Sequence, residues 1–161
     1  MSSLLKNLDN TRAVAIDLSP DAVALTKCNA MEFIEDRRLN LLNCSLESFI
    51  QMNQYKFHFD FIVSNPPYIE TAAVSCLERE VFDYESHLAL DGGIDGLDVI
   101  KQLISSSPML LKKCSYQELY LEMGYKQRPL VESFISGLSL ARAMEFWNDF
   151  QGISRFAKIV Y

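Results

Sequence analysis

Phe59-Asp-Phe-Ile-Val-Ser-Asn-Pro-Pro-Tyr68 is the stretch on which the interpretation of this sequence depends. Its first six residues, 59–64, are mostly large and apolar, which predicts a buried β-strand. The two prolines that follow fix their backbone φ angles near roughly −65° and remove two N–H donors. Asn65 precedes a proline and is therefore held in an extended conformation. We expect a stiff loop at the carboxyl end of a strand, carrying an amide side chain and an aromatic ring.

This loop has the chemistry to hold a planar group that bears an –NH₂. The side chain of Asn65 and the carbonyls of the loop can accept the N–H protons, which leaves the nitrogen lone pair exposed. The ring of Tyr68 can pack against the plane. Such an arrangement suits methyl transfer to a weakly nucleophilic nitrogen, where positioning supplies much of the rate. The alternative is a proline turn between two strands with no chemical role.

The rest of the chain alternates between strand and helix patterns. Ser19-Pro20-Asp21 has the residues of a helix start, namely a cap, a first-turn proline and an acid. Residues 69–94 have no clear period, and we expect short hairpin strands closed by Gly92-Gly93. The alternation predicts the α/β class, with a parallel sheet and helices on both faces. Strands are expected at 12–17, 39–44, 59–64, 117–123, 140–146 and 155–161, helices at 20–36, 96–105 and 128–136, and a short helix or turn at 47–53.

Asp17 ends the first predicted strand. In doubly wound sheets, ligands bind outside the carboxyl ends of the strands. A carboxylate in this place can accept hydrogen bonds from two ribose hydroxyls of a nucleotide. The alternative is that Asp17 is an acid of the following turn or helix start.

The composition excludes several classes of protein. With 161 residues and 49% hydrophobic residues, the chain is long enough for one folded domain. Fifteen Lys and Arg against 21 Asp and Glu give a net charge of −6, which argues against a module that wraps nucleic acid. The four cysteines form no Cys-x-x-Cys pair and there are two histidines, so we expect no metal site and four reduced core thiols. No apolar run reaches the length of a membrane span.

Four segments together resemble one enzyme family. Phe59–Ile69 resembles the signature loop of amino-methyltransferases that use S-adenosylmethionine. Ala15–Ala30 resembles the acid and helix of peptide-chain release factor glutamine methyltransferases, Glu80–Leu97 resembles that family's hairpin, and Tyr120–Tyr125 resembles its next strand end. The resemblance covers about residues 12–130. Methyltransferases of nucleic acids share the loop but not the hairpin.

The resemblance implies a Rossmann-like class I methyltransferase sheet and S-adenosyl-L-methionine as the cofactor. It implies methyl transfer to the side-chain amide of the glutamine in the Gly-Gly-Gln loop of a translation release factor. Asp17 would bind the ribose, Ser45 and Leu46 would lie beside the adenine, and Asn65 would touch the methionine end and the substrate amide. The substrate slot would be lined by Pro66, Pro67 and Tyr68, and closed with the help of Glu85. Asn65, Pro66 and Tyr68 are the expected catalytic residues.

The sequence also departs from the family pattern. The family has a strand and a Gly-rich loop before the acid, whereas the sixteen residues before Asp17 contain no glycine. We therefore expect residues 1–161 to form a partial catalytic domain without the first strand, the Gly-rich loop and the N-terminal helical domain. Loss of a central strand exposes two edges, so we expect poor cofactor binding and aggregation. Alternatively, the two edge strands pair directly. Ser45 also stands where the family usually has an acid.

Two other functions remain open from the sequence. An adenine amino-methyltransferase acting on nucleic acid would use the same loop, because adenine is also planar and carries an –NH₂. The acidic balance and the hairpin favour the release factor, and we expect no direct binding of nucleic acid and no membrane association. The chain could also be a catalytically inactive fragment. We expect an intracellular location, which the family resemblance places in mitochondria for a eukaryotic source and in the cytoplasm otherwise.

Overall fold

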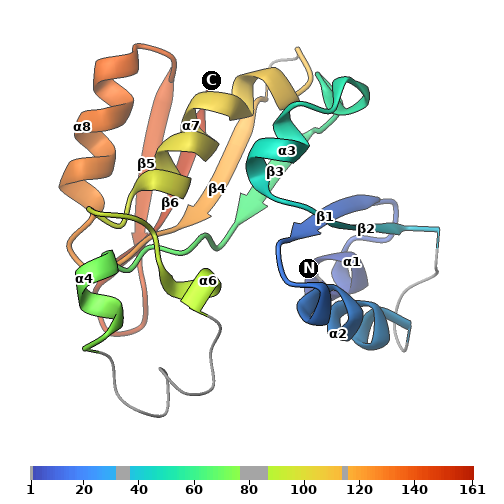
Figure 1. Cartoon of the computed structure of the whole chain (residues 1–161). Coiled ribbons are helices and arrows are strands. Elements are labelled where there is room, and N and C mark those ends of the chain that lie inside the picture. The colour runs from blue at the N-terminus through green and yellow to red at the C-terminus, as the bar shows by residue number, and fades with distance from the viewer. Residues whose placement is uncertain (1, 32–36, 77–86, 114–115) are drawn as a thin grey trace. The chain divides into compact units, whose positions relative to one another are not determined.

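The computed structural model describes residues 2–31, 37–76, 87–113 and 116–161 (Figure 1). The chain divides into two compact units, residues 1–53 and residues 54–161. That residues 1–161 form a single partial catalytic domain stays a prediction. Within the described residues, no helix is long and apolar enough to cross a membrane.

The first unit is a two-stranded parallel sheet with short helices. Its elements are α1 (Ser2–Asn7), β1 (Ala13–Asp17), α2 (Pro20–Met31), β2 (Leu39–Asn43) and α3 (Leu46–Ile50). Ser19 begins α2 as predicted, because its hydroxyl accepts the N–H of Ala22 at 3.3 Å and Pro20 takes the first helical position. The predicted extension of this helix over 32–36 lies outside the described residues. The core is small, with Leu5 and Ala30 buried against two partly buried neighbours, Ala13 and Leu39.

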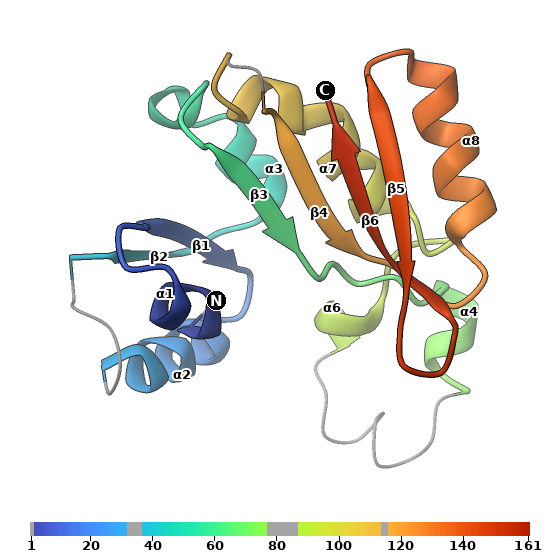
Figure 2. The ribbon, with the colours of Figure 1, turned by 180° about the vertical axis from the view of Figure 1, so that it is seen from behind.

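The second unit is built on a four-stranded sheet in the order β3-β4-β6-β5 (Figure 2). The strands are β3 (Phe61–Ser64), β4 (Glu118–Glu122), β5 (Ala143–Asn148) and β6 (Ser154–Val160). β3 and β4 are parallel, while β6 is antiparallel to both β4 and β5. The sheet is therefore mixed rather than wholly parallel. A turn of only five residues joins β5 to β6, and so short a connection requires antiparallel strands. Asp149 fixes this turn by accepting the N–H groups of Gln151 and Ile153, each at 2.9 Å.

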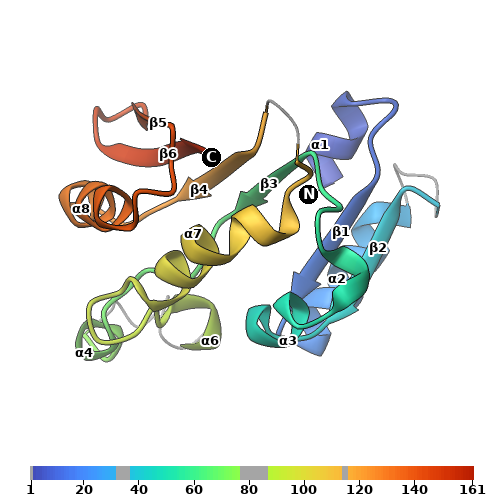
Figure 3. The same ribbon diagram turned by 90° about the horizontal axis from the view of Figure 1, so that it is seen from above.

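The two long helices of the second unit, α7 (Asp98–Leu110) and α8 (Arg128–Leu138), lie on the same face of the sheet (Figure 3). Leu119 and Leu121 of β4 are buried on the helix-covered side. Tyr120 points to the other face, where Trp147 and Phe156 remain 42% and 40% exposed. The α/β class is as predicted, but in the part of the chain described here these helices cover one face of this sheet only.

Helix α7 runs further than predicted because it continues through Pro108. A proline inside a helix has no N–H for the carbonyl four residues earlier, which here belongs to Ile104. The hydroxyl of Tyr161 replaces that donor, at 2.8 Å from the Ile104 oxygen. Burial raises the pKa of Tyr161 well above its usual range, so the hydroxyl keeps its proton. This contact ties the end of the chain to α7.

In its described residues, the segment between β3 and α7 contains no strand of the predicted hairpin. Its described residues contain two short helices, α4 (Thr71–Val74) and α6 (His87–Leu90), and a single parallel bridge between Ile69 and Asp91. Residues 77–86 of the predicted hairpin lie outside the described residues. The cysteine prediction was also wrong for two positions, because Cys28 and Cys76 are exposed rather than part of the core.

Each unit has a strand with one unused edge. β1 pairs with β2 and β3 pairs with β4, and among the described residues neither strand has a second neighbour. Phe61 and Val63 of β3 are apolar yet 37% and 45% exposed. Direct pairing of the two edge strands stays a prediction.

Candidate functional site

The loop after β3 has the features expected of an amide-binding site. Pro66 is buried, Pro67 and Tyr68 are half-buried, and Asn65 is exposed. No hydrogen bond occupies the Asn65 side chain within the described ranges. Because proline fixes φ and Asn65 precedes one, the loop backbone has little freedom to move the Cα that carries this side chain. Asn65 is thus an exposed amide on a rigid support.

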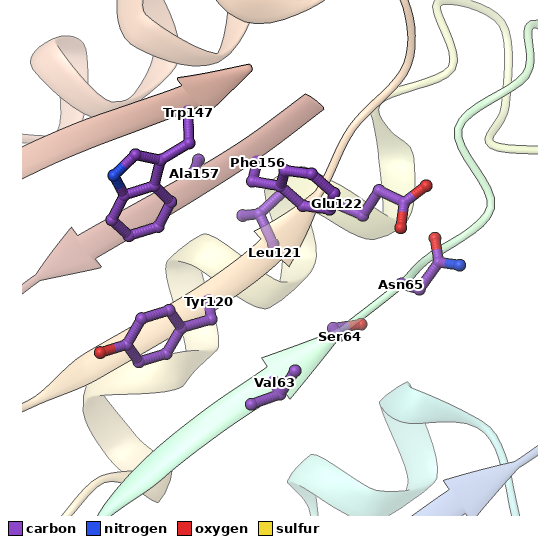
Figure 4. A pocket seen from close by; sticks show the side chains of 9 residues that line it. All are labelled: Val63, Ser64, Asn65, Tyr120, Leu121, Glu122, Trp147, Phe156 and Ala157. Carbon is purple, nitrogen blue, oxygen red and sulfur yellow. The ribbon is translucent and has the colours of Figure 1, made fainter. Parts of the chain in front are cut away.

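A cavity of about 260 Å³ adjoins this loop (Figure 4). Asn65 and Ser64 border it at the end of β3, and Glu122 borders it at the end of the neighbouring strand β4. The two strands are parallel, so their carboxyl ends meet at one edge of the sheet. The remaining lining is mainly apolar and aromatic, from Val63, Tyr120, Leu121, Trp147, Phe156 and Ala157.

Glu122 fixes the aromatic ring of the loop. The hydroxyl of Tyr68 donates to Oε1 of Glu122 at 3.3 Å. Figure 4 shows the carboxylate of Glu122 at the same end of the cavity as the amide of Asn65. Sequence reasoning did not single out Glu122, although its place at the end of a strand beside β3 was a usable signal.

A charged cluster supports the other end of the same sheet face. Nζ of Lys158 lies 2.7 Å from Oε1 of Glu118, and the hydroxyl of Tyr120 donates to Oε2 of Glu118 at 2.7 Å. The hydrogen bond from Lys158 lowers the pKa of Glu118, and the same bond raises the pKa of Lys158. Burial and the nearby Glu118 raise the pKa of Tyr120. All three groups therefore keep their usual charge states at neutral pH.

The buried side chain of Gln127 touches the loop from behind. Its Nε2 donates to the carbonyls of Tyr68 at 2.9 Å and Gly96 at 3.1 Å, and its Oε1 accepts the N–H of Gly124 at 2.7 Å. One side chain thus joins the loop after β3, the turn before α7 and the turn after β4. No pattern in the sequence pointed to Gln127.

The predicted ribose-binding acid lies in the first unit, at the carboxyl end of β1. Oδ1 of Asp17 accepts the N–H of Ser19 at 2.9 Å, so the residue does form the turn that the alternative predicted. The carboxylate is exposed and borders a cavity of about 200 Å³. A carboxylate has about four acceptor positions, so one bond to Ser19 leaves capacity for a ligand.

The predicted adenine-side residues follow the adjacent strand. Asp17 pairs in register with Asn43, so Ser45 and Leu46 lie just past the same sheet edge. The hydroxyl of Ser45 accepts the N–H of Ser48 at 3.1 Å and thereby caps α3, of which Leu46 is the first residue. The structure thus groups Asp17, Ser45 and Leu46 in one unit and the residues 65–68 in the other. Glu85 lies outside the described residues.

Comparison with known proteins gives close matches by sequence. No family model matches the chain. A release factor glutamine methyltransferase of Geobacter sulfurreducens is 37% identical over 134 residues, covering 83% of this chain and 44% of that protein. The human MTRF1L release factor glutamine methyltransferase is 31% identical over 163 residues, covering 98% of this chain and 47% of that protein. The chain spans about half the length of these curated relatives.

A solved structure shows the same fold. The release factor-specific protein-(glutamine-N5) methyltransferase of Alicyclobacillus acidocaldarius superposes with a TM-score of 0.54 at 18% identity, covering 98% of this chain and 84% of that one. At this identity the likeness concerns the fold alone. It confirms the predicted class I methyltransferase fold.

Proposed function

Because the chain belongs to the release factor glutamine methyltransferase family, we propose that it takes part in S-adenosylmethionine-dependent methylation of a glutamine side-chain amide in a release factor. Within the release factor, we propose that the methylated residue is the glutamine of a Gly-Gly-Gln loop. The observation that carries the proposal is the exposed amide of Asn65, held on a proline loop beside a cavity at the carboxyl end of β3.

The residues present fit part of the cofactor. The exposed carboxylate of Asp17 has the acceptor oxygens that ribose hydroxyls require. Ser45 and Leu46, past the same sheet edge, offer a hydroxyl and an apolar side chain for the adenine. Asn65 would contact the methionine end. When bound, S-adenosylmethionine supplies an electrophilic methyl group.

The loop's own chemistry accounts for how an amide could be held for reaction. The side-chain oxygen of Asn65 and the backbone carbonyl oxygens of the loop can accept the two N–H protons of the glutamine amide. These hydrogen bonds orient both N–H groups toward the loop, so that the free face of the nitrogen points away from it. Pro66, Pro67 and the ring of Tyr68 provide the flat wall that keeps this plane in place. Positioning of this kind can supply several kcal/mol of a barrier, roughly 7–11 kcal/mol at best.

The loop cannot by itself distinguish a glutamine amide from the amino group of adenine. The family membership favours the amide, and the net charge of −6 disfavours an extended phosphate backbone. Binding of a release factor and location in mitochondria stay predictions.

The test is transfer of radiolabelled methyl from S-adenosylmethionine, with the chain in excess over substrate so that weak cofactor binding does not hide the product. Three substrates are compared: a release factor with a Gly-Gly-Gln loop, the same factor with that glutamine replaced by alanine, and an adenine-containing oligonucleotide. Label in the first alone is expected. Label in the oligonucleotide, or equal label in both release factors, contradicts the proposal.

Asn65→Ala is the matching protein variant. It should abolish detectable transfer, because the amide loses its main acceptor. Asn148→Ala, at an exposed position of β5, removes the same side chain elsewhere in the unit and should leave transfer unchanged.

A further inference from the structure

We propose that Gln127 is the positioning residue of the amide-binding loop, an inference that rests on the function proposed above for that loop. Gln127 is 7% exposed and makes three hydrogen bonds through its side chain, to the carbonyls of Tyr68 and Gly96 and to the N–H of Gly124. It precedes α8, so the helix carries it on a rigid element.

The loop needs hydrogen bonds from other segments because its own sequence has few backbone donors. Pro66 and Pro67 have no N–H, so the loop has two fewer donors with which to fasten itself to the sheet. A carbonyl is therefore the natural backbone group by which the loop can be held. The carbonyl of Tyr68, directly after the prolines, is the one that receives the amide of Gln127 at 2.9 Å.

Glutamine matches this place in both donors and acceptor. Two carbonyl oxygens face its NH₂ group, and one backbone N–H faces its oxygen. A glutamate would turn a second oxygen toward those carbonyls, and a methionine of similar length would leave all three groups unpaired. An unpaired buried polar group costs about 1–3 kcal/mol.

Three glycines let the surrounding backbone approach the loop. A Cβ added at Gly92 would lie 2.8 Å from the carbonyl oxygen of Pro67, and one at Gly124 would lie 3.1 Å from the ring of Tyr68. A Cβ at Gly96 would overlap the carbonyl oxygen of Tyr68, and its φ of +69° also favours glycine. The backbone at these three glycines thus packs against Pro67 and Tyr68, and Gln127 forms hydrogen bonds with Tyr68 and with two of the glycines.

The support should act on Asn65 through the chain. Only the two prolines separate Asn65 from Tyr68, and both are stiff, so a shift at Tyr68 is transmitted to the amide. A misplacement of about 1 Å can cost about 100-fold in rate. We therefore expect Gln127 to set the turnover rate rather than the binding of the release factor.

The first arm of the test is kinetic and uses Gln127→Met, which keeps the side-chain volume. The kcat for methyl transfer to the release factor should fall about 100-fold with KM unchanged, measured well below the unfolding temperature and per folded molecule. Gln151→Ala, in the exposed turn between β5 and β6, is the control and should leave kcat unchanged. An unchanged kcat for Gln127→Met would overturn the proposal.

The second arm is amide hydrogen exchange of the wild-type chain and Gln127→Met, without cofactor or substrate. The N–H groups of Ile69 and Gly92, which bond Leu90 and Ile69 at 3.0 and 2.8 Å, should exchange faster in the variant. Those of Leu119 and Ile159 in the central strands should accelerate less, because they report only the loss of global stability. Uniform acceleration would assign Gln127 a general structural role and refute positioning. If the wild-type chain transfers no methyl, the proposed function fails, and this arm alone decides whether Gln127 holds the loop.

Discussion

The two units of this chain differ in how extensively packing and hydrogen bonds support their candidate site residues. In residues 54–161, α7 and α8 bury one face of a four-stranded sheet, and the loop 65–68 is braced by a buried glutamine. In residues 1–53, Asp17 lies at the end of a two-stranded sheet with a small core around Leu5 and Ala30. The comparison teaches that the loop proposed to bind the amide is held within one well-packed unit, whereas the acid proposed to bind the ribose lies in a unit with a small core.

The largest expected effect concerns the glycine behind the loop. Gly96→Ala should lower the free energy of unfolding of residues 54–161 by about 2–4 kcal/mol, because the new Cβ overlaps the Tyr68 carbonyl and φ is positive. Urea denaturation followed by the fluorescence of Trp147 measures this, since the chain has one tryptophan. If amide hydrogen exchange in Gly96→Ala accelerates as much in β1 as in β4, the two units are not independently stable and the contrast between them is wrong.

Gly137→Ala is the matched control, at a helical position of α8. A Cβ there meets nothing within 4 Å. Alanine is the better helix former, so this variant should gain about 0.5–1 kcal/mol. Equal losses for both glycines would show that close approach to the loop is not what Gly96 provides.

The next effect concerns the bond that secures α7. Tyr161→Phe should cost about 1–2 kcal/mol, because the carbonyl of Ile104 then loses the donor that replaces the missing N–H of Pro108. In a Pro108→Ala background the backbone N–H returns, so the same substitution should cost less. A double-mutant cycle of unfolding free energies measures the difference. Equal costs in both backgrounds would contradict this role of Tyr161.

The smallest effect is electrostatic. The pKa of Glu118 is lowered by Lys158, so the ion pair stabilises the fold above the unfolded-state pKa of a glutamate, and this contribution is lost as the pH falls through the lowered folded-state pKa. Lys158 has a raised pKa, so its share is present below the unfolded-state pKa of lysine and is lost only as the pH rises through the folded-state pKa. Glu118→Gln should therefore flatten the loss of stability in acid. If the free energy of unfolding falls equally steeply with acid in Glu118→Gln and in the wild type, the ion pair does not have this role.

Sequence patterns predicted the elements that depend on local signals. Ser19 and Pro20 start α2, the apolar run before Asn65 forms β3, and Gly124 follows β4. The helix predicted over 96–105 ended too early, because the sequence cannot show that Tyr161 satisfies the carbonyl that Pro108 leaves without its helical donor. The strand β6 was predicted, but its antiparallel direction was not, because the direction depends on the short turn after β5 and not on the strand's own residues.

The candidate site was predictable only in part. Asn65-Pro-Pro-Tyr68 was conspicuous because two prolines after an apolar strand are rare in ordinary turns. Gln127 was not, because one glutamine in a turn has no periodicity, and its role arises only when three distant backbone segments meet. The loop was predictable because its stiffness comes from adjacent residues. Its support was not, because that depends on tertiary contacts between residues distant in the sequence.

The most direct test of this account is calorimetric titration of the 161-residue chain with S-adenosylmethionine, with its oligomeric state checked by size exclusion. We expect weak binding, because Asp17 and Ser45, which would contact the ribose and the adenine, lie in a unit whose buried core is small. Tight, saturable binding of one molecule per monomeric chain would contradict the account, since it would require a fully formed cofactor site.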